Sequence, residues 1–97
     1  MSELDKIKHV LRQNKSALKK QFKIKTLGVF GSYARGVQKK NSDVDILVTF
    51  SHTPGLFDYI KAENHLSAML HKKVDLVMKG TLKPTIGKNI MREVMYV

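Results

Sequence analysis

The chain has 97 residues, with 18 Lys and Arg against 8 Asp and Glu, no Cys, and a formal net charge of +10 at pH 7. This length predicts one domain over residues 1–97, and the lack of Cys excludes disulfides and thiolate metal sites. Because no apolar run is long enough to span a bilayer and the first residues lack a secretory signal, we expect a cytoplasmic protein. The positive charge predicts anionic partners such as nucleotides, nucleic acid or an acidic protein.

The first part of the chain is predicted to fold as a helix followed by two strands. Residues 3–20 carry apolar side chains at helical spacing, which indicates an amphipathic helix. Its predicted apolar stripe consists of Leu4, Ile7, Val10, Leu11, Ala17 and Leu18. Residues 24–30 are rich in β-branched and aromatic side chains and end at Gly31, which predicts a strand that leads into a tight turn. Residues 44–50 form a second predicted strand.

The second part continues the alternation of helix and strand. Pro54 is predicted to open a second helix. Its predicted buried side consists of Leu56, Tyr59, Ile60, Leu66, Met69 and Leu70. Residues 74–78 form a third predicted strand, and residues 85–96 have apolar side chains at helical offsets, although residues 94–97 fit a strand equally well. The pattern predicts an α/β fold, a small mixed sheet of three to four strands flanked by helices, without an internal domain boundary.

The turn at Gly31-Ser32 is a candidate phosphate-binding element. A strand that ends in Gly-Ser and continues into a short helical turn offers backbone N–H groups, a hydroxyl and a positive dipole end to an anion. Gly31 permits close backbone approach or a positive φ, while Ser32 can cap the turn and donate a hydrogen bond to phosphate. Arg35 lies one turn further on, where it could meet phosphate or brace the turn against an acid. A Gly-Ser turn alone is also compatible with an ordinary capped turn.

Three acids in apolar strand-like runs form the second candidate element. Asp43 and Asp45 stand at positions i and i+2, so their side chains point to the same face of a strand. Two parallel carboxylates repel one another unless a cation such as Mg²⁺ neutralises them. If Asp75 in the third strand converges on the pair, the site could hold two metal ions about 4 Å apart, as in nucleotidyl transfer. Taken separately, Asp43 fits a turn residue and Asp75 fits a salt bridge to Lys72 or Lys73.

The two elements together resemble a known signature. Gly31-Ser32, ten intervening residues and Asp43-Val44-Asp45 resemble the GSX10DXD motif of the nucleotidyltransferase superfamily related to DNA polymerase β. The segments Gly31–Gly36 and Ser42–Asp45 are similar to those of the minimal nucleotidyltransferases, the MNT family. The agreement in helix and strand order extends over essentially the whole chain.

This resemblance implies transfer of a nucleoside monophosphate from Mg-ATP to an acceptor hydroxyl with release of pyrophosphate. By position, Gly31 and Ser32 would hold the triphosphate, and Asp43 and Asp45 would bind the metal ions. Asp75 would match the third carboxylate, which contributes to the metal site and helps activate the acceptor hydroxyl. The implied cofactor is Mg²⁺, with two ions, and ATP is the implied substrate.

The resemblance also implies a partner. A chain of 97 residues leaves no room for the helical domain that binds the acceptor in larger members, so the acceptor is expected on another molecule. Stand-alone MNT proteins of this size resemble antitoxins that adenylylate a tyrosine of a HEPN-type ribonuclease toxin. The chain is therefore expected to act on such a toxin.

Other functions remain open from the residues themselves. The chain could be a non-catalytic binding module that neutralises its partner by contact, through the first helix and the lysine-rich surface. Direct nucleic-acid binding is not expected, because no array of stacking aromatic side chains and no zinc or helix-turn-helix signature accompanies the positive charge. Self-association through the first helix also stays open.

Overall fold

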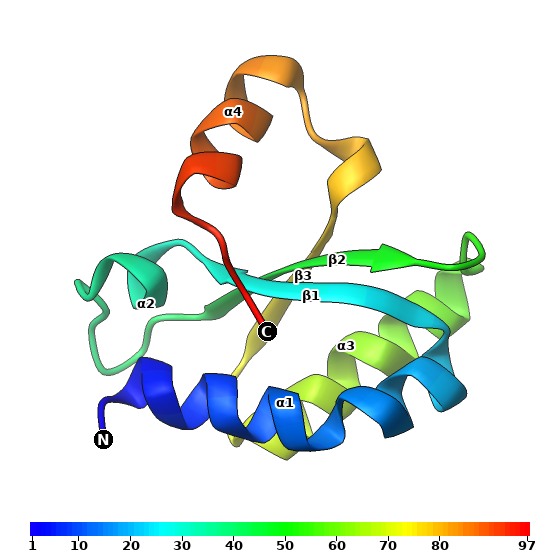
Figure 1. Cartoon of the computed structure of the whole chain (residues 1–97), viewed down its shortest axis with the longest axis horizontal. Coiled ribbons are helices and arrows are strands. Elements are labelled where there is room, and N and C mark those ends of the chain that lie inside the picture. The colour runs from blue at the N-terminus through cyan, green and yellow to red at the C-terminus, as the bar shows by residue number, and fades with distance from the viewer.

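The structure is a computed structural model that describes all residues from Met1 to Val97. It contains a mixed sheet with helices on both faces (Figure 1). The elements in chain order are α1 Glu3–Phe22, β1 Ile24–Phe30, α2 Ser32–Arg35, β2 Val44–Phe50, α3 Leu56–Leu70, β3 Val74–Met78, the 3₁₀ turn η1 Lys79–Thr81, α4 Pro84–Glu93 and β4 Met95–Tyr96. None of these helices combines the length and the apolar character needed to cross a bilayer.

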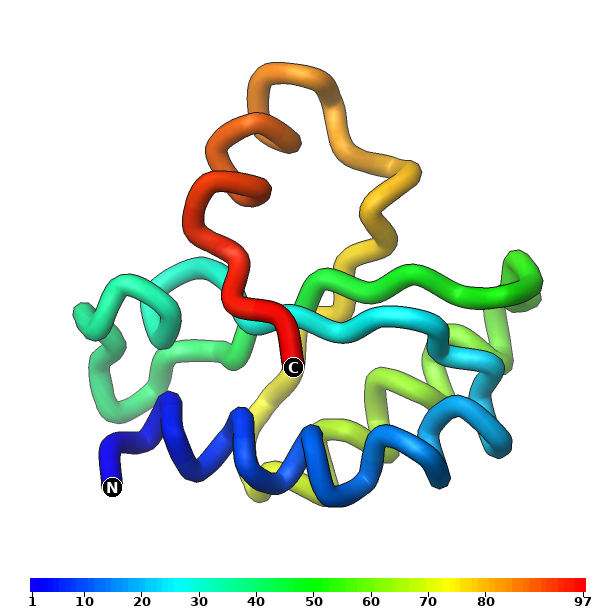
Figure 2. The backbone as a smooth tube through the Cα atoms, in the orientation of Figure 1, coloured from blue at the N-terminus to red at the C-terminus, as the bar shows by residue number.

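The four strands lie in the order β3-β2-β1-β4. Strand β1 runs antiparallel to β2 and β4, while β2 and β3 are parallel and are connected through α3. The backbone trace in Figure 2 shows α1 and α3 below the sheet and α4 above it. This arrangement confirms the predicted mixed α/β fold. The chain end that the sequence left open contains both elements, a helix to Glu93 and a short strand that pairs with Gly28 and Val29.

The main core lies between the sheet and the two helices α1 and α3. Val44, Ile46 and Val48 of β2 are fully buried there, as are Leu11 of α1 and Leu66 of α3. Because side chains alternate along a strand, the intervening residues of β2 point to the opposite face, towards α4. A smaller cluster of Phe30, Leu47 and Ile90 fixes α4 on that second face. The two faces of β2 therefore have different roles, one in the core and one available for chemistry.

Helix α3 fixes the position of the edge strand β3. The N–H of Val74 donates to the Ser67 hydroxyl at 3.0 Å, and the N–H of Leu76 donates to Glu63 Oε2 at 2.9 Å. These two N–H groups point outwards from the sheet, where an edge strand would otherwise leave them without partners. The residue between them, Asp75, is thereby held in place by bonds on both sides of it.

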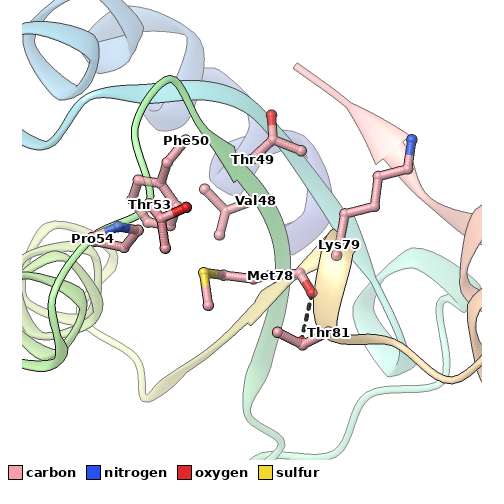
Figure 3. Close-up of a pocket in the computed structure, with 9 residues that line it drawn as sticks. Val48, Thr49, Phe50, Thr53, Pro54, Met78, Lys79 and Thr81 are labelled. Carbon is pink, nitrogen blue, oxygen red and sulfur yellow. Dashed lines mark hydrogen bonds between the residues drawn. The ribbon is translucent and has the colours of Figure 1, made fainter.

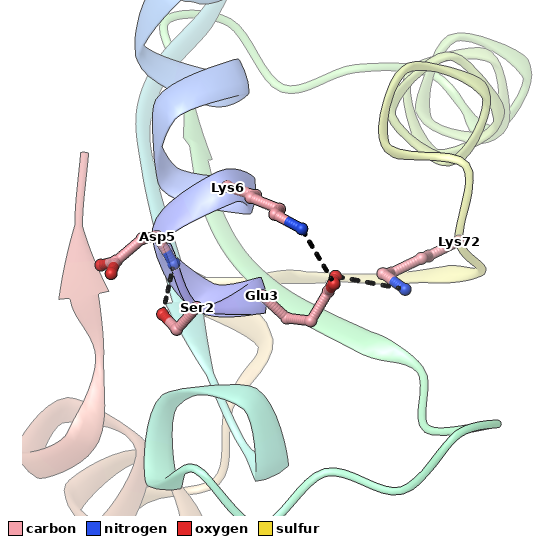
Figure 4. Close-up of polar contacts among 5 residues, drawn as sticks. All are labelled: Ser2, Glu3, Asp5, Lys6 and Lys72. Atoms are coloured by element: carbon pink, nitrogen blue, oxygen red, sulfur yellow. Dashed lines mark hydrogen bonds and ion pairs between the residues drawn. The ribbon is translucent and has the colours of Figure 1, made fainter.

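The start of α1 is joined to the α3–β3 connection by polar contacts (Figure 4). Ser2 caps α1 by accepting the N–H of Asp5 at 3.1 Å. Glu3 lies 3.6 Å from Lys6 and 3.6 Å from Lys72, measured between carboxylate oxygens and Nζ. Pairs this exposed contribute at most about 1 kcal/mol each, so they orient the helix end more than they stabilise the fold.

Some predicted details of the helices were wrong. Helix α3 starts at Leu56 with Gly55 as its N-cap, not at Pro54. Leu56 and Ile60 are 70% and 41% exposed, because the buried stripe runs through Ala62, Leu66 and Leu70. Leu56 precedes this stripe, and the helical repeat turns Ile60 away from it. Ala17 of α1 is also exposed.

Two leucines of α3 provide a matched test of this packing. We expect Leu66→Ala to lower the free energy of unfolding by about 3 kcal/mol, because it leaves a cavity in the main core. Leu56→Ala removes the same atoms from an exposed site and should change stability by less than about 0.5 kcal/mol. Urea denaturation followed by circular dichroism measures both, and equal losses would contradict the assigned core.

Candidate active site

The three aspartates lie at the beginning of the two parallel strands. Asp45 of β2 stands opposite Asp75 of β3 in the strand register, and Asp43 directly precedes β2. Their neighbours Val44 and Val74 are buried in the main core, so alternation directs the aspartates to the other face. The structure thus places Asp75 beside Asp45, as the sequence suggested. Asp45 is half-buried, whereas Asp75 is exposed on the edge strand.

The charge of this cluster is only partly compensated. Burial, followed by the charges of Asp75 and Asp43, raises the pKa of Asp45 from 3.8 to about 6, and Arg35 opposes this change. Asp43 has a cation nearby, because Lys73 Nζ lies 3.9 Å from its Oδ2. Asp75 has no ion pair within 4.0 Å, although Lys72 and Lys73 precede it closely in sequence. An excess of negative charge in a positively charged protein favours a bound cation here.

The Gly31 turn lies directly against Asp45. Gly31 has φ +76° and ψ −150°, a conformation open mainly to glycine, and a Cβ at this position would stand 2.1 Å from Asp45 Oδ2. The preceding residue, Phe30, pairs with Asp45 across β1 and β2. Glycine is therefore needed both for the backbone conformation and for the close approach of the turn to the carboxylate.

Ser32 has a different place in the turn from the one expected for a cap. Gly31 is the N-cap of α2 and Ser32 is its first helical residue, without a side-chain capping bond. The predicted capping role of Ser32 was therefore wrong, because the glycine-only conformation of Gly31 shifts the start of the helix by one residue. Ser32 directly follows Gly31, the residue that contacts Asp45, and its hydroxyl makes no capping bond to the helix.

Arg35 braces the turn against an acid, which was one of its two predicted roles. Its Nη1 lies 2.8 Å from Oε2 of Glu93, the last residue of α4, and Gly31 N–H donates to Glu93 Oε1 at 3.0 Å. The hydrogen bond from Arg35 and the bond from Gly31 lower the pKa of Glu93 despite partial burial. Sequence analysis missed Glu93. The available signal was that it is the one acid in the basic C-terminal helix.

Two hollows on the surface differ in their relation to this site. One of about 360 Å³ is lined by residues including Thr49, Phe50 and Lys79, at the far ends of β2 and β3 from the aspartates (Figure 3). Another of about 330 Å³ is bordered by Asp43 itself and by three lysines, Lys40, Lys72 and Lys73. The second hollow brings positive charge next to the acidic cluster, where phosphate groups would be attracted.

The donor atoms of the cluster fit Mg²⁺. No three or more acidic or histidine side chains converge closely enough to cage a metal ion by themselves. Mg²⁺ typically binds one or two carboxylates and completes its shell with water and phosphate oxygens of the substrate. Asp43 and Asp45, with Asp75 adjacent, provide this kind of partial oxygen shell.

A small mixed sheet that sets a Gly-Ser turn against a strand-borne carboxylate pair defines a nucleotidyltransferase type of domain. The nucleotidyltransferase domain family matches residues 11–97, and the chain belongs to this family as a minimal nucleotidyltransferase. It is thus an enzyme of the nucleotidyltransferase class.

Similar proteins match nearly the full length of the chain. Protein adenylyltransferase MntA of Thermococcus cleftensis is 47% identical over 97 residues, which cover 100% of this chain and 98% of MntA. A solved structure assigned to the minimal nucleotidyltransferases has a TM-score of 0.74 at 27% identity, over 92% of this chain and 93% of that one. A crystal structure of a toxin-antitoxin with AMP-PNP has a TM-score of 0.70 at 27% identity, over 99% of this chain and 72% of that one.

The two glycines of positive φ in the turn offer a test of the contact with Asp45. Gly36 has φ +72° but no atom within 4 Å of an added Cβ, so Gly36→Ala should cost about 1 kcal/mol of stability from backbone strain alone. Gly31→Ala adds the clash with Asp45 and should cost roughly 3 kcal/mol. Urea denaturation compares the two variants, and equal costs would contradict the close approach.

The raised pKa of Asp45 predicts a pH-dependent stability in metal-free buffer. The carboxyl has a pKa of 3.8 in the unfolded chain and about 6 in the folded protein, so the folded state becomes less stable as pH rises from 3.8 to 6. Above pH 6 the cost of the buried charge is complete and no longer changes with pH. Asp45→Asn should therefore stabilise the protein at pH 7.5 by about 1 kcal/mol, after discounting for solvent screening.

The gain from Asp45→Asn should shrink as pH falls towards 4, and saturating Mg²⁺ should raise the Tm of the wild type but not of this variant. Thermal unfolding in EDTA and in Mg²⁺ measures both effects. A gain that stayed constant from pH 7.5 to pH 4 would refute the electrostatic origin.

Proposed function

We propose that the chain transfers AMP from Mg-ATP to a tyrosine hydroxyl of a HEPN-type toxin and silences that toxin, so that it acts as an antitoxin. The observation that carries this proposal is the register of Asp45 against Asp75, with the Gly31-Ser32 turn in contact with Asp45. We further propose that residues 1–97 act as one domain and that the acceptor hydroxyl comes from the partner protein.

The turn and the aspartates have different proposed roles. In the proposed site, the turn with Gly31, Ser32 and Arg35 binds the triphosphate, and Asp43, Asp45 and Asp75 hold the metal ions. Mg²⁺, when bound, neutralises charge on the phosphates and on the departing pyrophosphate. These residues suit their roles by the chemistry of their side chains, and their spacing resembles the GSX10DXD motif.

The exposure of the aspartates suggests the direction of approach. Asp45 is half-buried at the beginning of the inner strand β2, beside the turn, whereas Asp75 is exposed on the edge strand β3. The acceptor hydroxyl therefore reaches the site from the Asp75 side, and Asp75 accepts its proton. The hydroxyl oxygen forms a bond to the α-phosphorus of ATP. The bond from the α-phosphorus to the oxygen that bridges it to the β-phosphorus breaks, and pyrophosphate leaves with that oxygen.

The comparisons support the choice of donor and partner. The Thermococcus relative is a protein adenylyltransferase, and the structurally similar toxin-antitoxin was solved with AMP-PNP, an analogue of ATP. The formal net charge of +10 also favours attraction to ATP and to an acidic protein surface.

An apolar patch favours contact with a partner as the second candidate function. Leu56 and Phe57 at the start of α3 are neighbours that are 70% and 77% exposed, so they form a small apolar patch. A chain that only binds its partner through this patch would not need its aspartates. The two functions therefore differ in what removal of the carboxylates does.

Removal of two carboxylates tests the transfer reaction. We expect Asp43→Asn with Asp45→Asn to lower AMP transfer from labelled ATP to a co-purified HEPN-type protein by roughly a hundredfold or more. Asp58→Asn is the matched control, because Asp58 is an exposed acid of α3 outside the site. Labelling of the acceptor tyrosine, followed by mass spectrometry, is the measurement.

The same variants separate the alternatives in cells. If the double variant labels the toxin as well as wild type does, the proposed site is wrong. If it fails to label but still protects cells from the toxin, neutralisation by contact replaces transfer as the antitoxin function.

A further inference from the structure

Glu93 joins the C-terminal helix to both ends of the Gly31–Arg35 turn. Its Oε1 accepts the Gly31 N–H at 3.0 Å, and its Oε2 accepts Arg35 Nη1 at 2.8 Å. The Glu93 side chain is 24% exposed and the Arg35 side chain is 54% exposed, so the carboxylate is the inner member of the pair. One side chain from far along the sequence thus uses both of its oxygens on a single short turn.

The bond to Gly31 fixes the least favourable part of that turn. Gly31 has φ +76° and ψ −150°, and its backbone lies against the Asp45 carboxylate. Two carboxylates, those of Glu93 and Asp45, therefore flank one glycine. Glu93 accepts its N–H, and the Arg35 N–H donates to its carbonyl oxygen at 3.1 Å. The Gly31 N–H is engaged by Glu93, so Gly31 shapes the turn while Ser32 and Arg35 are among the groups that remain for phosphate.

The bond to Arg35 orients a flexible cation. A guanidinium has five N–H donors in a planar fork, and Glu93 engages one of its two terminal nitrogens, so other donors stay available to a phosphate. An arginine already held in position loses less conformational freedom when it binds an anion than a free one does.

The helix that carries Glu93 is itself anchored. Ile90 lies one helical turn before Glu93 and packs with Phe30 and Leu47 in the small cluster on this face of the sheet. Phe30 directly precedes Gly31, so the same helix contacts the end of β1 through an apolar side chain and the turn through a charged one. The position of Glu93 relative to the turn is therefore set by packing.

We propose that Glu93 is a positioning residue for nucleotide binding, which holds Gly31 and Arg35 in the arrangement that receives the triphosphate. This inference rests on the proposed function of the same turn and aspartates. It assigns to the C-terminal helix a part in nucleotide binding that the signature motif does not contain.

The test measures binding of Mg·AMP-PNP by calorimetry, which needs no acceptor. We expect Glu93→Ala to weaken binding about tenfold. Glu93→Gln should weaken binding less than Glu93→Ala does, because the glutamine amide oxygen can still accept the Gly31 N–H. It should still bind less tightly than wild type, because the negative charge that holds Arg35 is gone. Asn89→Ala, an exposed residue of the same helix, is the control and should bind as wild type does.

A double-mutant cycle with Arg35→Ala separates positioning from a general loss of structure. If Glu93 acts through Arg35, the double variant should bind little worse than Arg35→Ala alone, whereas independent effects would multiply. Thermal unfolding checks that each variant is folded at the temperature of measurement, and Glu93→Gln keeps the test informative if Glu93→Ala does not fold.

Three results would overturn the inference while the proposed function stands. The first is an unchanged affinity of Glu93→Ala for Mg·AMP-PNP, and the second is a tighter affinity, which would mean that Glu93 competes with phosphate. The third is that the effects of Glu93→Ala and Arg35→Ala on the affinity multiply fully in the double variant. Failure of the wild type to bind Mg·AMP-PNP would overturn the proposed function and the inference together. Normal binding with unchanged transfer by the variant that combines Asp43→Asn and Asp45→Asn would overturn the proposed function of the aspartates alone.

Discussion

The site depends on the contact between a glycine turn and a half-buried carboxylate. Gly31 approaches Asp45 so closely that no side chain fits between them, and burial together with Asp75 and Asp43 raises the pKa of that carboxyl. Such a cluster is unfavourable by itself, because like charges repel and desolvation opposes ionisation. It persists because the other face of β2, with Val44 and Ile46, is fully buried in the main core.

The mixed topology of the sheet explains why these groups meet. Antiparallel pairing brings the end of β1 next to the beginning of β2, where Phe30 pairs with Asp45. The parallel crossover through α3 brings the beginning of β3 to the same place, where Asp75 stands opposite Asp45. A turn between two antiparallel strands and an acid on a parallel neighbour are thereby collected at one end of the sheet. Ser67 and Glu63 of α3 hold β3 in this register by bonds to its outer edge.

The two faces of the sheet separate stability from chemistry. The face towards α1 and α3 holds most of the buried apolar side chains, and the face towards α4 has only the small cluster of Phe30, Leu47 and Ile90. The face that carries the aspartates therefore remains partly open, as the proposed transfer from ATP to a side chain of another protein requires. Helix α4 covers part of it and contributes Glu93 to the turn.

Local patterns along the chain were sufficient to predict the strands, the placement of Asp43 and Asp45 on one strand face, and a Gly-Ser turn at the end of a strand. These follow from neighbours along the chain, through strand alternation and turn chemistry. Three features came from the folded arrangement instead. Asp75 faces Asp45, Glu93 engages Gly31 and Arg35 across separations of 62 and 58 residues, and Leu56 and Ile60 are exposed. Strand register and helix docking are set by packing between distant segments, and periodicity in one segment carries no information about which partner it meets.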